Sequence, residues 1–405
     1  MGRTRTLHAF RTLRVMPELC VLEGVREIPR DEWNALVADD SPFLEWDWLA
    51  SLEEAGCVGE GSRGGDGSGW APRPLVVREA GRLVAACPLY VKGNSEGEFV
   101  FDWGWAEAAL HAGIAYYPKL LVGVPFTPVT GGRLLTAPGV ARADWLGALA
   151  GALRQLCTEN DLSGVHVNFC REDEKQALER AGFLPRLGHQ YHWFNHGYAD
   201  FEDYLAQLRS KRRNQVRRER RSVAEAGIRV ETCLGGGIPD ALFPKLFPLY
   251  LSTIRKKYWG RQYLNARFFE LLRERFRDRL CVVMARAGEQ VLAGAINVQK
   301  GDALYGRYWG ALREVRHLHF DVCYYAGIEH AIRAGLRRFE PGAGGEYKQL
   351  RGFDAQPTWS AHWLADPRLH DAVARHLERE RAEAGDAIDW IRERSALKAG
   401  TRAGE

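Results

Sequence analysis

The sequence predicts an α+β protein made of two similar halves, each with a mixed, mainly antiparallel sheet flanked by helices. A chain of 405 residues is too long for one ordinary core and suggests two domains of about 200 residues each. An internal echo supports this division. LVVREAGRLVAACPLYVK (75–92) and VVMARAGEQVLAGAINVQK (282–300) both show an apolar strand, a turn containing Ala-Gly and a second strand.

Similar elements follow each copy of the hairpin. FVFDWGW (99–105) and ALYGRYWG (303–310) are aromatic runs, and each is expected to add a third antiparallel strand. A helical pattern and a further strand come next: WLGALAGALRQLCTEN before GVHVNFC in the first half, and VCYYAGIEHAIRAG before LRRFE in the second. The chain is therefore interpreted as a duplicated domain.

The boundary between the halves is expected near residue 197. Helix, turn and strand patterns end just before it, and Asp200 can cap a new helix, with Asp203 three positions later. The insertion GEGSRGGDGSGW (59–70) has the composition of a flexible loop. The predicted organisation is a basic tail at 1–17, a first domain at 18–197, a second domain at 198–395 with a basic helix at 205–226, and a polar tail at 396–405.

Composition excludes several classes of protein. The formal net charge of +4 is small for this length and gives no reason to expect a DNA-binding protein. No apolar run is long enough for a transmembrane helix, although peripheral contact with a membrane stays open. Eight cysteines occur singly and without a C-x-x-C motif, which favours reduced thiols, a cytoplasmic setting and no metal site.

The order of elements in each half resembles the GNAT acyltransferase fold. Four segments strengthen that likeness: SPFLEWDWLASLEEAG, YYPKLLVGVPFTPVTGGRLL, LYGRYWG and FDVCYYAGIEHAIRAGLRRFEPGAGGEYKQLRGF. From about residue 41 to about residue 365, the chain resembles the FemAB-like family, often labelled peptidoglycan biosynthesis or recognition proteins, within the GNAT superfamily. The resemblance implies tandem GNAT-like domains.

Two short motifs carry a more distant resemblance. FE-x-G at 339–342 and YK-x-x-x-GF at 347–353 are similar to D-F-G-G and FK-x-x-F-G positions of the Fem aminoacyltransferases. Those enzymes transfer an amino acid from aminoacyl-tRNA to a peptidoglycan precursor. Glu340 stands where they carry Asp, and Lys348 stands where they carry a loop Lys.

Acyl transfer to an amine requires three functions at one place. The amine must lose a proton, the developing oxyanion must be stabilised, and the leaving group must gain a proton. The resemblance places these functions where the strands ALYGRYW and RRFEP splay apart. Lys348 is expected to stabilise the oxyanion or grip a phosphate, Glu340 to act on the amine, with Glu346 as second choice, and Tyr308 to donate to the leaving oxygen.

Each of these residues also has an ordinary structural interpretation. Lys348 can be a solvated loop lysine, Glu340 a solvated strand end, and Tyr308 a core aromatic residue. Tyr305 and Tyr308 are three apart, so a regular strand would point them to opposite faces.

Further residues are candidates for substrate binding. The glycine-rich loop can direct backbone N–H groups at a ligand, and aromatic residues of the first half can line a cleft. The candidates are Glu346, Gly344, Gly345, Arg351, His319, Asp102, Trp103 and Trp105.

The basic run LRSKRRNQVRRERRSVAEAG contains a row of arginines on one helical face: Arg209, Arg213, Arg217 and Arg220. Like charges at this spacing destabilise a helix unless an anion offsets them, so the row is a candidate phosphate-binding site for tRNA, a nucleotide-sugar diphosphate or lipid headgroups. The alternative is a solvated helix relieved by Glu219 and Glu225.

No cofactor is firmly indicated. Acetyl-CoA-dependent GNAT enzymes usually carry Q/R-x-x-G-x-G/A before the long helix, where the linker here is GALREVRHLHFD. Aminoacyl-tRNA is therefore favoured over acyl-CoA as the acyl donor, although Arg313 and Arg316 can still contact phosphate. The prediction is an N-acyltransferase acting on a peptidoglycan precursor or a related small acceptor. Its alternatives are a non-catalytic binding protein for a cell-wall or nucleotide-sugar ligand, and an atypical acyl-CoA-dependent N-acetyltransferase.

Overall fold

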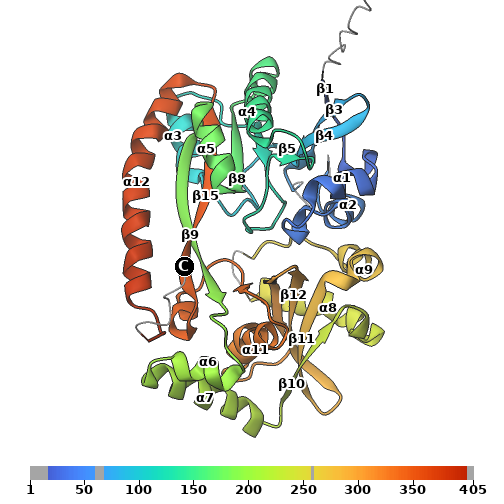
Figure 1. Ribbon diagram of the computed structural model, residues 1–405, viewed down its shortest axis with the longest axis vertical. Coiled ribbons are helices and arrows are strands. Elements are labelled where there is room, and N and C mark those ends of the chain that lie inside the picture. Colours follow the sequence, from blue (N-terminus) through green and yellow to red (C-terminus); the bar gives the residue numbers. More distant parts are fainter. Residues whose placement is uncertain (1–16, 60–67, 257–259, 399–405) are drawn as a thin grey trace, which may run out of the picture.

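The computed structural model describes residues 17–59, 68–256 and 260–398 (Figure 1). The predicted basic tail at 1–17 lies outside these residues except for its last position, and so does most of the insertion at 59–70. Within the described part of the chain, one sheet of eleven strands runs through both halves, and a smaller sheet of four strands lies beside it.

The long sheet joins strands of both halves edge to edge. Its order is β10 (Arg229–Leu234), β11 (Leu280–Ala287), β12 (Gln290–Lys300), β13 (Ala303–Ala311), β14 (Arg338–Glu340), β9 (Leu184–Phe194), β15 (Asp354–Leu364), β8 (Gly164–Cys170), β6 (Lys119–Val122), β5 (Leu89–Lys92) and β2 (Trp70–Pro72). The small sheet contains β1 (Glu18–Val21), β3 (Leu75–Glu79), β4 (Arg82–Cys87) and β7 (Leu135–Thr136).

Helices cover the sheets of each half. The first half contains η1 (Val25–Glu27), α1 (Arg30–Val37), η2 (Pro42–Leu44), α2 (Trp46–Glu54), α3 (Trp103–His111), α4 (Arg142–Glu159) and α5 (Glu172–Arg180). The second half contains α6 (Phe201–Gln207), α7 (Ser210–Glu225), η3 (Gly235–Gly237), η4 (Asp240–Leu242), α8 (Phe243–Arg255), α9 (Ala266–Arg275), η5 (Arg277–Arg279), α10 (Leu318–Phe320), the π-helical turn η6 (Asp321–Tyr325), α11 (Ala326–Arg333), η7 (Glu346–Arg351) and α12 (Pro367–Glu393). Apolar side chains of α4 and α5 share one core with β6 and β8, and those of α8 and α9 share another with β11 and β12.

The two predicted hairpins are present. β3 pairs antiparallel with β4 through a turn in which Ala80 and Gly81 both have positive φ, and β11 pairs antiparallel with β12 through a turn at Gly288, where φ is +56°. In the second half β13 extends its hairpin as the expected third strand.

The third strand expected at 99–105 in the first half is wrong. Residues Trp103–His111 form α3 instead. The run Ala106–Leu110 consists of strong helix formers, and their preference outweighs the aromatic residues that suggested a strand.

The first half is not a contiguous stretch of sequence. β15, from the second half, lies between β8 and β9 and pairs antiparallel with both. α12 follows and lies beside β9 and β15 (Figure 1). The buried residues Leu369, Val373 and Leu377 of α12 pack with Trp105. The prediction that 198–395 forms the second domain alone is therefore corrected: its last strand and helix complete the sheet of the first half.

Two smaller expectations also change. The basic helix predicted at 205–226 is interrupted, because Leu208 adopts an extended conformation between α6 and α7 and forms a β-bridge with Leu397. The predicted polar tail begins with buried residues: Ala396 and Leu397 are 3% and 4% exposed. The described end of the chain is therefore anchored beside α7.

Candidate active site at the separation of β13 and β14

β13 and β14 run parallel for only three residue pairs before they separate. The last pair is Tyr305 with Glu340. A Cβ added to Gly306 would lie 3.1 Å from the backbone of Pro341, so glycine permits the close approach at this point. Beyond this point β13 continues, whereas β14 ends and leads into the loop 341–345. The separation contains a cavity of about 270 Å³, which we name the gap hollow.

A β-bulge shapes the β13 wall of the gap hollow. Gly306 pairs with Asn297 and Tyr308 pairs with Ile296, so Arg307 is an extra residue without a partner across the ladder. The bulge brings Tyr305 and Tyr308 to the same face, which corrects the expectation that they point to opposite faces. Arg307 donates to the carbonyl oxygen of Phe126 at 2.7 Å and so links β13 to the first half.

Tyr308, a predicted catalytic residue, contributes to the edge of the gap hollow, but its ring lies on the face of β13 that carries Tyr305 and a separate cavity beside Glu340. Its ring packs against Tyr250 and Phe269, and its buried hydroxyl has no hydrogen-bond partner among the described residues. Burial raises the pKa of this hydroxyl, so it stays protonated near neutral pH and can donate a hydrogen bond.

Lys348 points inward rather than into solvent. It follows Gly345, which has a φ of +88°, and its side chain is buried against the loop. The ammonium donates to the carbonyl oxygens of Gly342 and Gly344 and lines the gap hollow. Burial lowers the pKa of Lys348 to about 8. The gap hollow therefore contains an ammonium group that loses its proton more easily than an exposed lysine does.

His319 and Tyr324 form the opposite wall of the gap hollow. His319 is the second residue of α10, which leads into the π-helical turn Asp321–Tyr325, a distortion often found at functional sites. Its ring lies edge-on to Trp309 and Tyr324, at 5.0 and 5.3 Å between ring centroids. Burial, and secondarily the charges of Arg351 and Lys348, lowers the pKa of His319 to about 4. The imidazole is therefore neutral at neutral pH and can accept a hydrogen bond, but it is a weak base.

Arg351 holds the loop in place through contacts with other protein groups and is not open to a ligand. It is 1% exposed and pairs with Glu219 of α7 at 2.9 Å. It also donates to the hydroxyl of Tyr325 at 2.7 Å and to the carbonyl oxygen of Tyr347 at 2.8 Å. Its guanidinium is thus occupied by protein groups, which corrects its expected role in substrate binding.

Glu340 faces away from Lys348. It lies on the opposite face of the sheet, in a separate cavity of about 630 Å³, which we name the Glu340 hollow. Oε1 accepts a hydrogen bond from Arg338 at 2.9 Å, and His192 lies 3.7 Å from Oε2. The expectation that Glu340 acts beside Lys348 is therefore corrected. Glu346, the second choice, is exposed.

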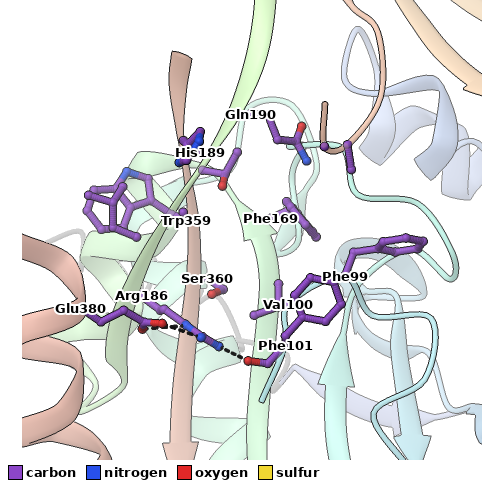
Figure 2. Close-up of a pocket in the computed structure, with 15 residues that line it drawn as sticks. Phe99, Val100, Phe101, Phe169, Arg186, His189, Gln190, Trp359, Ser360 and Glu380 are labelled. Carbon is purple, nitrogen blue, oxygen red and sulfur yellow. Dashed lines mark hydrogen bonds and ion pairs between the residues drawn. The ribbon is translucent and has the colours of Figure 1, made fainter. Parts of the chain in front are cut away.

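A third cavity lies on the other side of the glycine-rich loop (Figure 2). This junction hollow has a volume of about 280 Å³ and is lined by β9, β15, α12 and the segment 99–101. Ala343 and Gly344 line both the junction hollow and the gap hollow. Figure 2 shows Arg186 between Glu380, which it contacts at 2.7 Å, and the carbonyl oxygen of Phe101, at 2.8 Å.

The three first-half candidates do not form one wall. Asp102 is 1% exposed and binds Lys119, whose charge lowers the pKa of this carboxyl although burial opposes it. Trp103 is 54% exposed, whereas Trp105 is buried beneath Arg186. The expectation that all three bind the acceptor is corrected: Asp102 belongs to a buried charge cluster and Trp105 to the core.

The arginine row of α7 is only partly open. Arg217 pairs with Glu202, and Arg220 pairs with Asp321 and Glu329. Arg209 is exposed and Arg213 half-buried. Phosphate binding stays a prediction, now centred on Arg209 and Arg213. Glu219 does not relieve the row, because its carboxylate is turned toward Arg351.

Other features of the molecule bear on its chemistry. Residues 17–59, 68–256 and 260–398 contain no group of three or more His, Cys, Asp or Glu side chains arranged to hold a metal ion. Across the same residues, no helix combines the length and the apolar character that a bilayer-spanning segment requires. All eight cysteines are free.

The sequence matches the profile of one protein family over residues 24–399, and this family is described as peptidoglycan biosynthesis/recognition. The chain belongs to the FemAB-like family. No curated protein matches the sequence at a significant level.

Solved structures agree with this membership at the level of the fold. The crystal structure of FemX is 12% identical and has a TM-score of 0.53, covering 86% of this chain and 98% of its own. A conserved protein of unknown function from Bacteroides thetaiotaomicron is 8% identical, with a TM-score of 0.50 and coverages of 86% and 99%. A tandem GNAT protein from the clavulanic acid biosynthesis pathway is 15% identical, with a TM-score of 0.45 and coverages of 87% and 99%. This FemAB-like chain thus has the predicted α+β architecture of mixed, mainly antiparallel sheets flanked by helices.

Several residues of these cavities escaped the sequence analysis. Arg307 gives no local signal, because a bulge depends on register with the neighbouring strand. His192 and Arg186 lie on β9, whose alternating pattern indicated only a strand. Their surroundings come from β14 and α12, more than 140 residues later in the chain.

Proposed function

We propose that this FemAB-like protein is an N-acyltransferase that moves an aminoacyl or acyl group to an amine of a peptidoglycan precursor or a related small acceptor. One observation carries the proposal: the loop residues Ala343 and Gly344 line two cavities, one of which holds the buried ammonium of Lys348. A donor in the gap hollow and an acceptor in the junction hollow would meet at this loop. Holding two reactants side by side is itself a large contribution to catalysis.

The residues of the gap hollow suit each step of the transfer. The amine nitrogen attacks the carbonyl carbon, forming a C–N bond, and the bond to the leaving oxygen or sulfur breaks. The ammonium of Lys348 can stabilise the negative charge that develops on the carbonyl oxygen. The neutral His319 can accept a hydrogen bond from the attacking amine, and water takes up the proton that the amine loses, because a pKa of about 4 makes this imidazole a weak base. The leaving group then takes a proton from Lys348 or from water.

The region before α10 favours an aminoacyl carrier over acyl-CoA as the donor. Its sequence GALREVRHLHFD lacks the glycine pattern that lets backbone N–H groups surround a pyrophosphate. Arg209 and Arg213 on α7 have no ion-pair partner among the described residues, so their charges suit a longer polyanionic donor such as a charged tRNA.

Substitution of Lys348 provides the test. Lys348→Ala should abolish transfer to a UDP-linked muropeptide while leaving the melting temperature within a few degrees of the wild type. The matched control is Lys245→Ala, since Lys245 is an exposed lysine of α8. Full activity of Lys348→Ala would refute the proposal.

Thermal shift can identify the donor. Charged tRNA, acetyl-CoA and the UDP-linked muropeptide are compared at saturating concentrations, because a ligand that binds only the folded state raises the melting temperature. Stabilisation by charged tRNA is expected. Stabilisation by acetyl-CoA alone would overturn the choice of donor and leave the acyltransferase proposal standing.

A further inference from the structure

The Glu340 hollow is a second polar cavity, on the face of the sheet opposite the gap hollow. Tyr305, His192, Glu340 and Gln356 line it, and both halves of the molecule contribute walls. The close backbones of Gly306 and Pro341 separate this hollow from the gap hollow. A ligand here would therefore be distinct from the acyl donor.

Three polar side-chain atoms of this hollow have no hydrogen-bond partner within the part of the chain that the structure describes. The residue Glu340 is 5% exposed, yet its Oε2 is buried without a hydrogen bond. Nε2 of His192 lies 3.7 Å away, too far for a hydrogen bond, and also has no partner. Nε2 of Gln356 is likewise buried without a hydrogen-bond partner among the described residues. Unsatisfied buried polar atoms are costly, so these groups are suited to a ligand that supplies both donors and an acceptor.

The charges around the hollow favour a cation at Glu340. Each basic residue of the lining already has an acidic partner at 2.9 Å: Asp40 for Arg171, Glu45 for Lys300, and Oε1 of Glu340 itself for Arg338. These basic groups are therefore already neutralised by partners.

At the rim, Asp39 and Asp302 add exposed negative charge. Burial lowers the pKa of His192, so its imidazole does not supply a compensating positive charge at neutral pH. A single incoming cation would leave the lining of the hollow close to neutral.

We propose that the Glu340 hollow binds a primary ammonium group with a neighbouring hydroxyl, the arrangement found in amino sugars and amino alcohols. The ammonium donates to Oε2 of Glu340. The hydroxyl donates to Nε2 of His192 and accepts from the amide of Gln356. No covalent bond changes in this step, and the site does not depend on the proposed transfer reaction.

Isothermal titration of the full chain with D-glucosamine and N-acetyl-D-glucosamine tests the site. Acetylation removes the positive charge and keeps the sugar ring, so glucosamine should bind at least tenfold more tightly. Equal affinity for the two sugars, or no binding of glucosamine, would overturn the proposal without requiring any variant.

Two substitutions then locate the binding. Glu340→Gln should weaken glucosamine binding at least tenfold, whereas Glu314→Gln, at an exposed and distant acid, should leave it unchanged. Lys348→Ala should retain glucosamine binding even though the proposed transfer is lost, which separates this site from the active site. Unchanged binding in a folded Glu340→Gln variant would refute the assignment.

Discussion

Lys348 carries a positive charge in a buried environment that disfavours its protonated form. Its ammonium is satisfied by two loop carbonyl oxygens, yet no carboxylate forms an ion pair with it among the described residues. Carbonyl groups keep the side chain in place without fixing its proton as a carboxylate would. The same group can therefore stabilise negative charge and release a proton.

This balance predicts a pH dependence. Burial lowers the pKa of Lys348 from 10.5 to about 8, so the ammonium form declines as pH rises through 8. One pH unit above that pKa, about one tenth of the molecules keep the proton. If the ammonium is required, kcat/KM should fall about tenfold between pH 7 and pH 9. Lys348→Arg should remove this decline, because arginine stays protonated throughout the range. Identical pH profiles of the two proteins would contradict the requirement.

At the element scale, a buried ion pair fastens the active-site loop to α7. The side chains of Arg351 and Glu219 are 2% and 4% exposed, and both also bind the hydroxyl of Tyr325. η7 carries both Lys348 and Arg351, so the position of the active-site ammonium depends on this contact.

Removing one partner should loosen that loop. Glu219→Ala leaves the guanidinium of Arg351 buried and unpaired, which typically costs about 3–5 kcal/mol. Urea unfolding should show this loss, and amide hydrogen exchange of 342–351 should become faster. Glu225→Ala, at an exposed position of the same helix, should change neither measurement by more than about 0.5 kcal/mol. Unchanged exchange in Glu219→Ala would show that the pair does not control the loop.

The sequence predicted features that depend on neighbouring residues better than features that depend on distant parts of the chain. Both hairpins were predicted correctly, because the turns that form them are encoded by adjacent Ala and Gly residues. The inward direction of Lys348 was suggested by a motif beside glycines that permit positive φ. The face of Tyr308 was predicted wrongly, since one extra residue at Arg307 shifts the alternation and leaves no mark in the strand pattern.

At the scale of the whole molecule, the long sheet makes the halves interdependent. β9 is the strand at which they meet: it pairs with β14 on one side and with β15 on the other. Arg307 adds a second link through the carbonyl oxygen of Phe126. The glycine-rich loop lines the junction hollow together with residues of the first half, whereas the gap hollow is lined by residues of the second half alone. The junction hollow therefore exists only when both halves are in place.

The return of β15 to the first half predicts how fragments of the chain behave. A fragment of residues 18–197 lacks the strand that covers β8 and β9, and it lacks the apolar face of α12. Unpaired strand edges associate with other chains, so the fragment should aggregate and give no cooperative thermal transition. The same fragment with residues 352–398 joined through a flexible linker should be more soluble and show a transition by circular dichroism. A monomeric 18–197 fragment that unfolds cooperatively would contradict the interdependence, because the first half would then be complete without the end of the chain.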